Sequence, residues 1–434
     1  MGLDLTLAAL QADRLPFTLD TLPPAAYFVG GSVRDALLRR DRPDFDLDIV
    51  LPSEAIPVAR ALADRYQGGF VVLDEQRQIA RVVLPGGTID IAQQVGPTME
   101  TDLKRRDFRI NAIAYNPHRQ KLLDPLKGVE DLKAGVLRMI AKENLGNDPL
   151  RVLRAYRQAA QLAFTIKPKT RNALRKFAPQ LRRISGERIR QELNLLLAAP
   201  QGLAQLQAAV DDRVLKDWLP NFKKPNLVQM EQVEQVAWLL GRIWLDLDTA
   251  LSQAVGAKSL SLLSLAKLAC CVAPQPERAT EQLSRLKYSR AEIQAVQTAL
   301  TVMPELLQLL QGELAPTQQY FFFQKVGPAF PIVIVLAVAI AARQGLLRET
   351  RAVGVVAPLV NAYLDPESQV AHPTPLVSGT KLMAALSLEP SPQIGNLLGE
   401  IHLARLSGRV STPEEAIAFA RAHLGRVSNG SSSP

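Results

Sequence analysis

The sequence is poor in cysteine, aromatic residues and histidine. Its two cysteines, Cys270 and Cys271, are too few for a disulfide scaffold or a cysteine-rich zinc site. They stand together in an apolar stretch, which predicts buried thiols in a reducing compartment. Aromatic residues make up only 5% of the chain, so extended stacking surfaces are not expected. The four histidines show no metal-ligand spacing, and we assign them to surface or packing roles.

Targeting signals and long hydrophobic runs are also missing. The first ten residues lack the basic start of a signal peptide. The longest apolar run, 332–342, is far shorter than the roughly 20 residues that a membrane span needs. The run therefore predicts a buried helix, and we expect a cytoplasmic protein without a membrane partner.

The charge distribution is more informative than the overall composition. The chain is 47% apolar and 21% charged, as in ordinary globular proteins, and its length predicts about three domains. Residues 101–200 contain 22 Lys and Arg against 9 Asp and Glu, although the net charge of the whole chain is only +9. Between Arg151 and Arg190, twelve basic residues face a single acid, Glu187. A block of one sign predicts a polyanionic partner, most simply a nucleic acid.

Hydrophobic patterning divides the chain into an α+β part and a helical part. Residues 26 to about 140 alternate between short apolar runs and amphipathic segments. Strands are expected at 26–29, 47–51, 70–73, 79–84, 88–92 and 110–115, with helices at 30–38 and 54–65. From Pro149 onward the pattern is helical, with helices near 150–163, 168–178 and 187–198 and several more to about 424. Clustered strands with few helices between them favour an α+β fold over a doubly wound sheet.

A glycine pair separates the first strand from the first helix. Gly30 and Gly31 allow backbone N–H groups to approach a phosphate, and the helix start that follows adds a favourable dipole. Arg34 adds a positive charge. The same residues also suit a purely structural turn, so this motif alone leaves both interpretations open.

Three acids enter the second expected strand. Asp44, Asp46 and Asp48 alternate, so they point to one side and repel one another unless a cation is present. Carboxylates beside a phosphate-binding loop fit Mg²⁺ and two-metal nucleotidyl transfer. Asp90, on another expected strand, is a candidate third acid. An acidic loop without function and an exposed strand charge are the alternatives.

Two further clusters combine charge with hydrogen-bonding groups. Arg106, Asp107 and Asn111 stand next to an expected strand and are able to hold a triphosphate and ribose hydroxyls. Asp148 and Arg151 are three residues apart at a helix start, where together they are able to read the Watson–Crick edge of C or A. A surface charge run and a helix cap with an ion pair are the respective alternatives.

Taken in this order, the motifs resemble the class II tRNA nucleotidyltransferase and bacterial poly(A) polymerase family. The resemblance rests on Gly30–Asp35, Asp46–Asp48, Arg105–Asn111, Asn147–Arg151, Asp124–Leu132 and Glu187–Leu193. It is strong over 26–195 and weaker over 375–418, whereas 200–370 matches only in helical character. It implies a catalytic head at 1–140, a helical neck at 141–200, a body at 201–365, a tRNA-binding tail at 366–427 and a disordered end at 428–434.

The resemblance also implies residue roles. Asp46 and Asp48 are expected to be catalytic and to hold two Mg²⁺ ions, with Asp44 or Asp90 as further candidate ligands. Nucleotide binding, with CTP and ATP as substrates, is assigned to Gly30, Gly31, Arg34, Arg106, Asp107, Asn111, Asp148 and Arg151. Binding of the tRNA acceptor stem and 3′ end is assigned to Arg154, Arg157, Arg182, Arg183, Arg188 and Arg190.

The sequence departs from the family pattern at four points. Asp44 is an additional acid, so the metal pair could be Asp44 and Asp46, although the strand that continues after Asp48 favours Asp46 and Asp48. Asn147 replaces the usual Glu, and Arg109 replaces a common Thr. Only nine residues, 93–101, separate Ala92 from Asp102, where relatives that add a full CCA end have a longer flexible loop.

The short 93–101 segment favours addition of CC, completed by a separate A-adding enzyme, with A addition and full CCA addition left open. A poly(A) polymerase of the same family is the nearest enzymatic alternative. The chain ends in Ser and Gly residues rather than the long basic tail of many such polymerases. An inactive RNA-binding protein is the alternative from another class, and the intact acidic and basic motifs argue against it.

Overall fold

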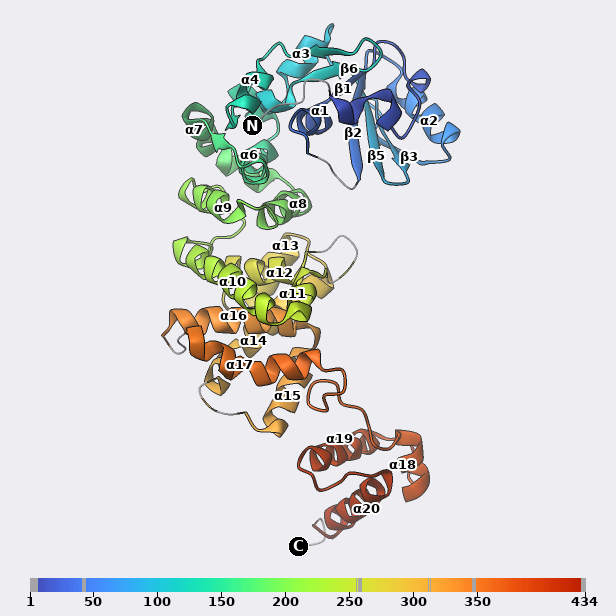
Figure 1. Ribbon diagram of the computed structural model, residues 1–434, viewed down its shortest axis with the longest axis vertical. Coiled ribbons are helices and arrows are strands. Elements are labelled where there is room, and N and C mark those ends of the chain that lie inside the picture. The colour runs from blue at the N-terminus through green and yellow to red at the C-terminus, as the bar shows by residue number, and fades with distance from the viewer. Residues whose placement is uncertain are drawn as a thin grey trace. The chain divides into compact units, whose positions relative to one another are not determined.

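The computed structural model describes residues 7–40, 44–254, 256, 260–310, 312, 314–345 and 349–430, with the side chains of 349–352 and 425–430 excluded. The chain forms two compact units, Met1–Pro220 and Asn221–Pro434. The first combines one large sheet with helices, and the second is helical wherever it is described, apart from an isolated bridge (Figure 1). The expected α+β head followed by helical regions is confirmed, and the finer division into neck, body and tail stays a prediction.

A seven-stranded mixed sheet forms the centre of the first unit, with the order β3-β4-β5-β2-β1-β6-β7 (Figure 1). The β2–β5 pair is parallel, and the other neighbouring pairs are antiparallel. The strands are β1 (Tyr27–Val29), β2 (Phe45–Leu51), β3 (Gly69–Asp74), β4 (Ile79–Leu84), β5 (Gly87–Gln93), β6 (Ala114–Asn116) and β7 (Lys121–Leu123). A separate parallel pair joins β8 (Val136–Leu137) to β9 (Thr165–Ile166).

Strand β2 places apolar and acidic side chains on opposite sides of the sheet. Leu47 and Ile49 are buried, while Asp46 and Asp48 alternate with them and lie on the other face. Helix α1 (Gly30–Leu37) contacts β2, and α2 (Ala55–Arg65) covers β3, β4 and β5. The acidic side chains are therefore fixed by a strand whose opposite face is part of the core.

One expected strand is only half correct. Over 110–115 the chain first forms a 3₁₀ turn, Arg109–Asn111, and β6 begins at Ala114. The Asp107 carboxylate accepts hydrogen bonds from the Phe108 backbone N–H and from Asn111 Nδ2, at 2.8 and 2.9 Å. A side chain that bonds to nearby donors competes with the strand ladder, which explains the turn.

The helices expected near 30–38, 54–65, 150–163, 168–178 and 187–198 are present close to those bounds, whereas the short helices at 99–104, 128–133 and 142–147 were not predicted. Helix α6 packs against α8 and α9, and α7 packs against α5. The helices after α2 are α3 (Met99–Lys104), α4 (Gly128–Lys133), α5 (Lys142–Asn147), α6 (Leu150–Leu162), α7 (Pro168–Phe177), α8 (Gly186–Leu197) and α9 (Gly202–Asp211).

The second unit has its own apolar core, to which α16 contributes most. The predicted buried helix at 332–342 is part of α16, and both cysteines are buried as expected. Burial raises the pKa of the Cys270 thiol to about 12. The helices are α10 (Lys224–Ile243), α11 (Leu245–Ser252), α12 (Leu262–Cys271), α13 (Pro276–Arg285), α14 (Arg290–Leu309), α15 (Pro316–Val326), α16 (Phe330–Arg343), α17 (Glu349–Leu364), α18 (Gly379–Leu386), α19 (Pro392–Leu406) and α20 (Pro413–Gly430). Of the expected disordered end, 428–430 instead belong to the last helix, and 431–434 lie outside the described residues.

The run Pro316–Arg343 is long and apolar enough to cross a membrane by composition alone. A 3₁₀ turn at Gly327–Ala329 divides it into α15 and α16, and 72% of its most apolar window is buried inside the protein. Burial of this kind is typical of a core helix, which is our interpretation.

A buried carboxylate fixes α6 in the first unit. Asp212, just after α9, accepts hydrogen bonds from Tyr156 Oη (2.7 Å), Arg171 Nε (2.5 Å) and Arg175 Nε (2.6 Å). Its side chain is fully buried. Asp212 thus links α6, α7 and the end of α9 through one group.

We expect Asp212→Ala to lower the free energy of unfolding by about 2 to 3 kcal/mol, because it leaves a buried hydroxyl and two guanidinium groups without their acceptor. Tyr156→Phe removes one hydrogen bond and should lower it by about 1 kcal/mol. Urea denaturation of the full chain measures both losses. Asp211→Ala, at the exposed neighbouring position, is the matched control and should change stability by less than about 0.5 kcal/mol. An equal effect of the two alanine variants would contradict the assignment.

Candidate active site

The expected nucleotide-binding motifs meet in one polar hollow of about 380 Å³ in the first unit. It lies between the acidic face of β2, the start of α1 and the side of α6. Its lining residues are Gly30, Gly31, Arg34, Asp46, Asp48, Arg106, Asp107, Asn111, Arg151, Arg154, Arg157 and Gln158.

The glycine pair begins α1 directly at the acidic strand. Gly30 has φ of +72°, and a Cβ atom there would lie 2.7 Å from Asp48 Oδ2. A side chain at this position is therefore excluded by both backbone conformation and space. Arg34, one turn later, is buried and donates from Nη1 to Asn111 Oδ1 at 2.8 Å and from Nε to Asp35 at 2.9 Å.

Asp46 and Asp48 are held side by side on β2. Thr88 Oγ1, on β5, donates to Asp46 Oδ1 at 3.0 Å. Burial, with smaller contributions from the nearby Asp46 and Asp90, raises the pKa of Asp48 to about 6 against the opposing charge of Arg106. Burial and the nearby acids therefore disfavour the ionised form of Asp48, and a cation bound beside it would stabilise that form.

The two other candidate metal ligands lie outside this hollow. Asp90 is paired with Arg81 of β4, with Nε–Oδ1 and Nη2–Oδ2 distances of 2.6 and 2.7 Å. Asp44 is exposed just before β2 and lines a separate, neighbouring hollow. The structure thus places Asp46 and Asp48 in the same hollow as most of the predicted nucleotide-binding residues. Asp44 and Asp90 do not line this hollow.

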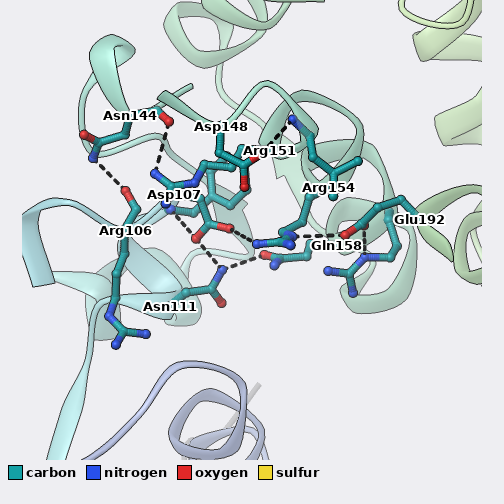
Figure 2. Close-up of polar contacts among 12 residues, drawn as sticks. Arg106, Asp107, Asn111, Asn144, Asp148, Arg151, Arg154, Gln158 and Glu192 are labelled. Atoms are coloured by element: carbon teal, nitrogen blue, oxygen red, sulfur yellow. Dashed lines mark hydrogen bonds and ion pairs between the residues drawn. The ribbon is translucent and has the colours of Figure 1, made fainter. Parts of the chain in front are cut away.

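Asp107 is the centre of a buried hydrogen-bonded network (Figure 2). Asn111 Nδ2 donates to both Asp107 Oδ1 (2.9 Å) and Gln158 Oε1 (3.0 Å), and Arg154 Nη1 lies 3.6 Å from Asp107 Oδ2. Burial alone would raise the pKa of Asp107, but Arg154 and the hydrogen bonds outweigh it and leave the pKa below its usual value. Asp107 therefore stays ionised and orients its neighbours.

Among the described residues, Asp148 and Arg151 do not form the ion pair that was the alternative to base reading, and each contacts other groups. Asp148 precedes α6, and Arg188 Nη2 of α8 donates to its carboxylate at 3.1 and 3.3 Å. Arg151 Nη1 donates to the backbone carbonyls of Arg105 (2.9 Å) and Asn144 (3.1 Å). Arg151 lines the hollow, whereas Asp148 does not (Figure 2).

Arg154 and Arg157, expected to bind RNA, also line the hollow. Glu192 of α8 accepts from Arg154 Nε at 3.1 Å and from Arg157 Nε at 2.5 Å, one arginine on each carboxylate oxygen. Its side chain is only 8% exposed. The other expected RNA-binding residues, Arg182, Arg183, Arg188 and Arg190, lie on the 3₁₀ segment Ala178–Arg183 and on α8, outside the hollow.

Three contributors were missed at the sequence level. Gln158 is a buried polar residue one turn beyond Arg154, and its position on the arginine-bearing face of α6 was an available signal. Glu192 stands inside the recognised 187–193 motif but received no role. Thr88 gave no signal, because only the β2–β5 register places it beside Asp46.

The charges that line the hollow complement an anion bound together with a cation. Five arginines line it against three aspartates, and the Nε atoms of Arg106 and Arg151 are buried without a hydrogen-bond partner among the described residues. Such donors fit phosphate oxygens. No group of three or more His, Cys, Asp or Glu metal ligands occurs among the described residues. Two adjacent carboxylates completed by substrate phosphates do, however, match the preference of Mg²⁺.

From the raised pKa of Asp48 we predict how the stability of the metal-free protein depends on pH. The carboxyl group binds its proton more tightly when folded than when unfolded, so the stability it contributes is present below about pH 4 and is lost as the pH rises through about 6. We expect Asp48→Asn, which cannot ionise, to be more stable than the parent by about 1 to 3 kcal/mol at pH 8, and by much less at pH 4. Urea denaturation in a chelator at both pH values measures the difference. Asp64→Asn, on the exposed side of α2, is the control, and a gain for Asp48→Asn that is the same at both pH values would contradict the argument.

Comparison with known proteins identifies the family. Residues 26–138 match the family model of the poly(A) polymerase head domain, 163–224 match that of the RNA- and SrmB-binding site of polymerase A, and 261–420 match that of tRNA nucleotidyltransferase domain 2. A CC-adding tRNA nucleotidyltransferase of Synechocystis sp. is 43% identical, over 94% of this chain and 96% of that protein. An A-adding tRNA nucleotidyltransferase of Deinococcus radiodurans is 34% identical, over 92% and 96% respectively.

Solved structures agree with the sequence relatives. The Thermotoga maritima CCA-adding enzyme complexed with tRNA matches with a TM-score of 0.66 and 25% identity, over 92% of this chain and 91% of that one. A complex of CCA-adding enzyme with CTP matches with a TM-score of 0.68 and 25% identity, over 92% and 90%. The expected membership is confirmed: the chain belongs to the tRNA nucleotidyltransferase family.

Proposed function

We propose that this enzyme adds two cytidines from CTP to the 3′ end of tRNA, with Asp46 and Asp48 holding the catalytic Mg²⁺ ions. The observation that carries the reaction type is the shared hollow, in which two adjacent carboxylates face five arginines. This arrangement complements a nucleoside triphosphate bound with its cations.

In the proposed reaction the terminal 3′-hydroxyl of the RNA attacks the α-phosphate of CTP. A new P–O bond forms, the α–β phosphoanhydride bond breaks, and pyrophosphate leaves. Bound Mg²⁺ supplies a lowered pKa of the attacking hydroxyl and charge neutralisation on the leaving group. The chain itself positions the reactants, because phosphoryl transfer depends mainly on alignment and electrostatics.

The arginines divide this task by their surroundings. Arg106 lies next to Asp48 and is placed to neutralise the phosphates nearest the reacting centre. Arg154 and Arg157 are held by Glu192 on the α6 side of the hollow, where we assign them to the triphosphate rather than to the RNA. Arg151, fixed by two carbonyls, and Asp148, fixed by Arg188, remain our candidates for reading the base.

The choice of CC addition rests on the 93–101 segment and on similarity. The segment is a tight turn in which Gln94 N donates to Leu51 O (2.7 Å) and Val95 N to Asp102 Oδ1 (3.1 Å). Thr98 then caps α3 through Thr101 N. The segment therefore has no free length for a loop that reshapes the base pocket for ATP. The higher identity to the CC-adding relative than to the A-adding one supports the same choice.

Addition of A is the second candidate, because an A-adding relative is 34% identical over most of both chains. Under the CC-adding proposal a separate enzyme must supply the terminal A. Arg182 and Arg183, which lie outside the hollow, are exposed and suit contact with the acceptor backbone. A poly(A) polymerase would need repeated ATP addition, which the same assay detects.

Primer extension tests the nucleotide choice. With Mg²⁺, tRNA ending at the discriminator base should gain two residues from CTP, with or without ATP, and tRNA ending in CC should not be extended. Products are resolved on a sequencing gel. Extension of the CC-ending tRNA by one A would instead establish A or CCA addition, and a long A tail would establish a poly(A) polymerase.

Substitution of a metal-binding acid separates chemistry from RNA binding. We expect Asp48→Ala to lower the extension rate by at least about 10³-fold, because it removes a carboxylate at the reacting centre. The dissociation constant for tRNA, measured by filter binding, should change less than threefold. Asp64→Ala is the matched control and should keep the parent rate. Full activity of Asp48→Ala would exclude the proposed site, and loss of both activity and binding would contradict the separation of roles.

A further inference from the structure

A second hollow, of about 720 Å³, lies on the other side of Asp46. It is bounded by the start of β2, by β4 and by the turn between β4 and β5, and it is lined by Asp44, Phe45, Asp46, Arg81, Val83, Leu84, Gly86, Gly87 and Thr88. Asp46 lines both hollows. A group bound in either hollow therefore has access to the same carboxylate.

A transfer reaction needs two substrates that meet at this carboxylate. The first hollow, with its five arginines, suits the triphosphate. The second contains a mixture of apolar and polar walls, with Phe45, Val83 and Leu84 beside Thr88 and Arg81. Such walls suit a base and ribose with one phosphate rather than a triphosphate.

Arg81 is the cation among the described residues of this second hollow. Strand register places Asp48, Asp90 and Arg81 in one row across β2, β5 and β4. Asp90 holds the Nε and Nη2 side of the guanidinium bidentately, and Nη1 makes no hydrogen bond within the described part of the chain. The Arg81 side chain is 41% exposed, so Nη1 is accessible to a ligand.

We propose that the second hollow binds the terminal nucleotide of the RNA, and that Arg81 binds the phosphodiester preceding its 3′-hydroxyl. The inference rests on the proposed function and assigns a subsite for the accepting RNA end. Asp90 is then a positioning residue, which fixes the guanidinium plane in the direction of the hollow. Asp44 and Asp46 line the same hollow, so loss of Arg81 leaves a lining that repels phosphate.

The test couples a protein change to a substrate change. The parent and Arg81→Gln are assayed with tRNA whose last phosphodiester is either native or replaced by an uncharged methylphosphonate. In the parent, the methylphosphonate should lower kcat/KM for tRNA by about tenfold to a hundredfold, as expected for a lost charge-assisted hydrogen bond. Arg81→Gln should lower it at least as much with native tRNA, because the acidic lining is then uncompensated, and the methylphosphonate should cause no further loss.

Two additional readouts separate this role from a structural one. KM for CTP should stay within twofold of the parent value in Arg81→Gln, because Arg81 does not line the first hollow. Arg81→Lys keeps the charge and should recover part of the loss and part of the methylphosphonate sensitivity. Arg77→Gln, in the turn between β3 and β4, is the matched control and should behave as the parent.

The outcomes are distinct. If the parent extends tRNA but is insensitive to the methylphosphonate, or if the losses from Arg81→Gln and methylphosphonate multiply, the subsite is overturned and the proposed function stands. If the parent does not transfer CTP to tRNA at all, the proposed function fails, and this inference with it. Should Arg81→Gln not fold, as judged by its melting temperature, Arg81→Lys carries the same comparison.

Discussion

The site depends on buried acids that hold neighbouring arginines close together before any ligand binds. Arg154 and Arg157 lie one turn apart on α6 and face the same hollow. Glu192 gives one carboxylate oxygen to each, and Asp107 provides a second acid for Arg154. Both acids are buried, so the pairs are little screened by water. The buried acids thus keep both guanidinium groups in position along the wall of the hollow.

On the opposite side of the hollow, strand β2 holds two negative charges close together. Asp46 and Asp48 are adjacent on one face of β2, and burial disfavours the charge of Asp48. The positive charges of Arg106 and Arg34 offset only part of this effect on Asp48. The same hollow contains a buried acid without full compensation and two buried arginine Nε atoms that have no partner within the part of the chain that the structure describes. A triphosphate bound with its cations would accept hydrogen bonds from the arginines and place positive charge beside Asp48. One ligand would therefore satisfy both sides of the hollow.

Sequence reasoning found the groups that local pattern specifies. The alternation of Asp46 and Asp48 with buried Leu47 follows from strand period alone, and Gly30 follows from the close approach of backbone to Asp48. The partners that lie far apart in the chain were not accessible in this way. Arg188 reaches Asp148 across 40 residues and Glu192 reaches Arg154 across 38, so only helix packing reveals them.

The same limit applies to the sheet. Asp90 was a reasonable third acid because its strand was correctly placed, but its pairing with Arg81 depends on the hairpin register between β4 and β5. The strand prediction for 110–115 was half wrong for a related reason. Its apolar pattern favours a strand, while the Asp107 side chain, which pattern analysis ignores, holds the first half in a turn.

The 93–101 segment and the reacting centre are connected through one carboxylate. Asp102 accepts from Val95 N at 3.1 Å and from Arg106 Nη2 at 3.3 Å. Arg106 in turn opposes the rise in the pKa of Asp48. The turn that makes the segment short is therefore fixed by the same group that fixes the guanidinium beside the metal-binding acids. The segment and the electrostatics of the reacting centre are therefore physically connected through Asp102.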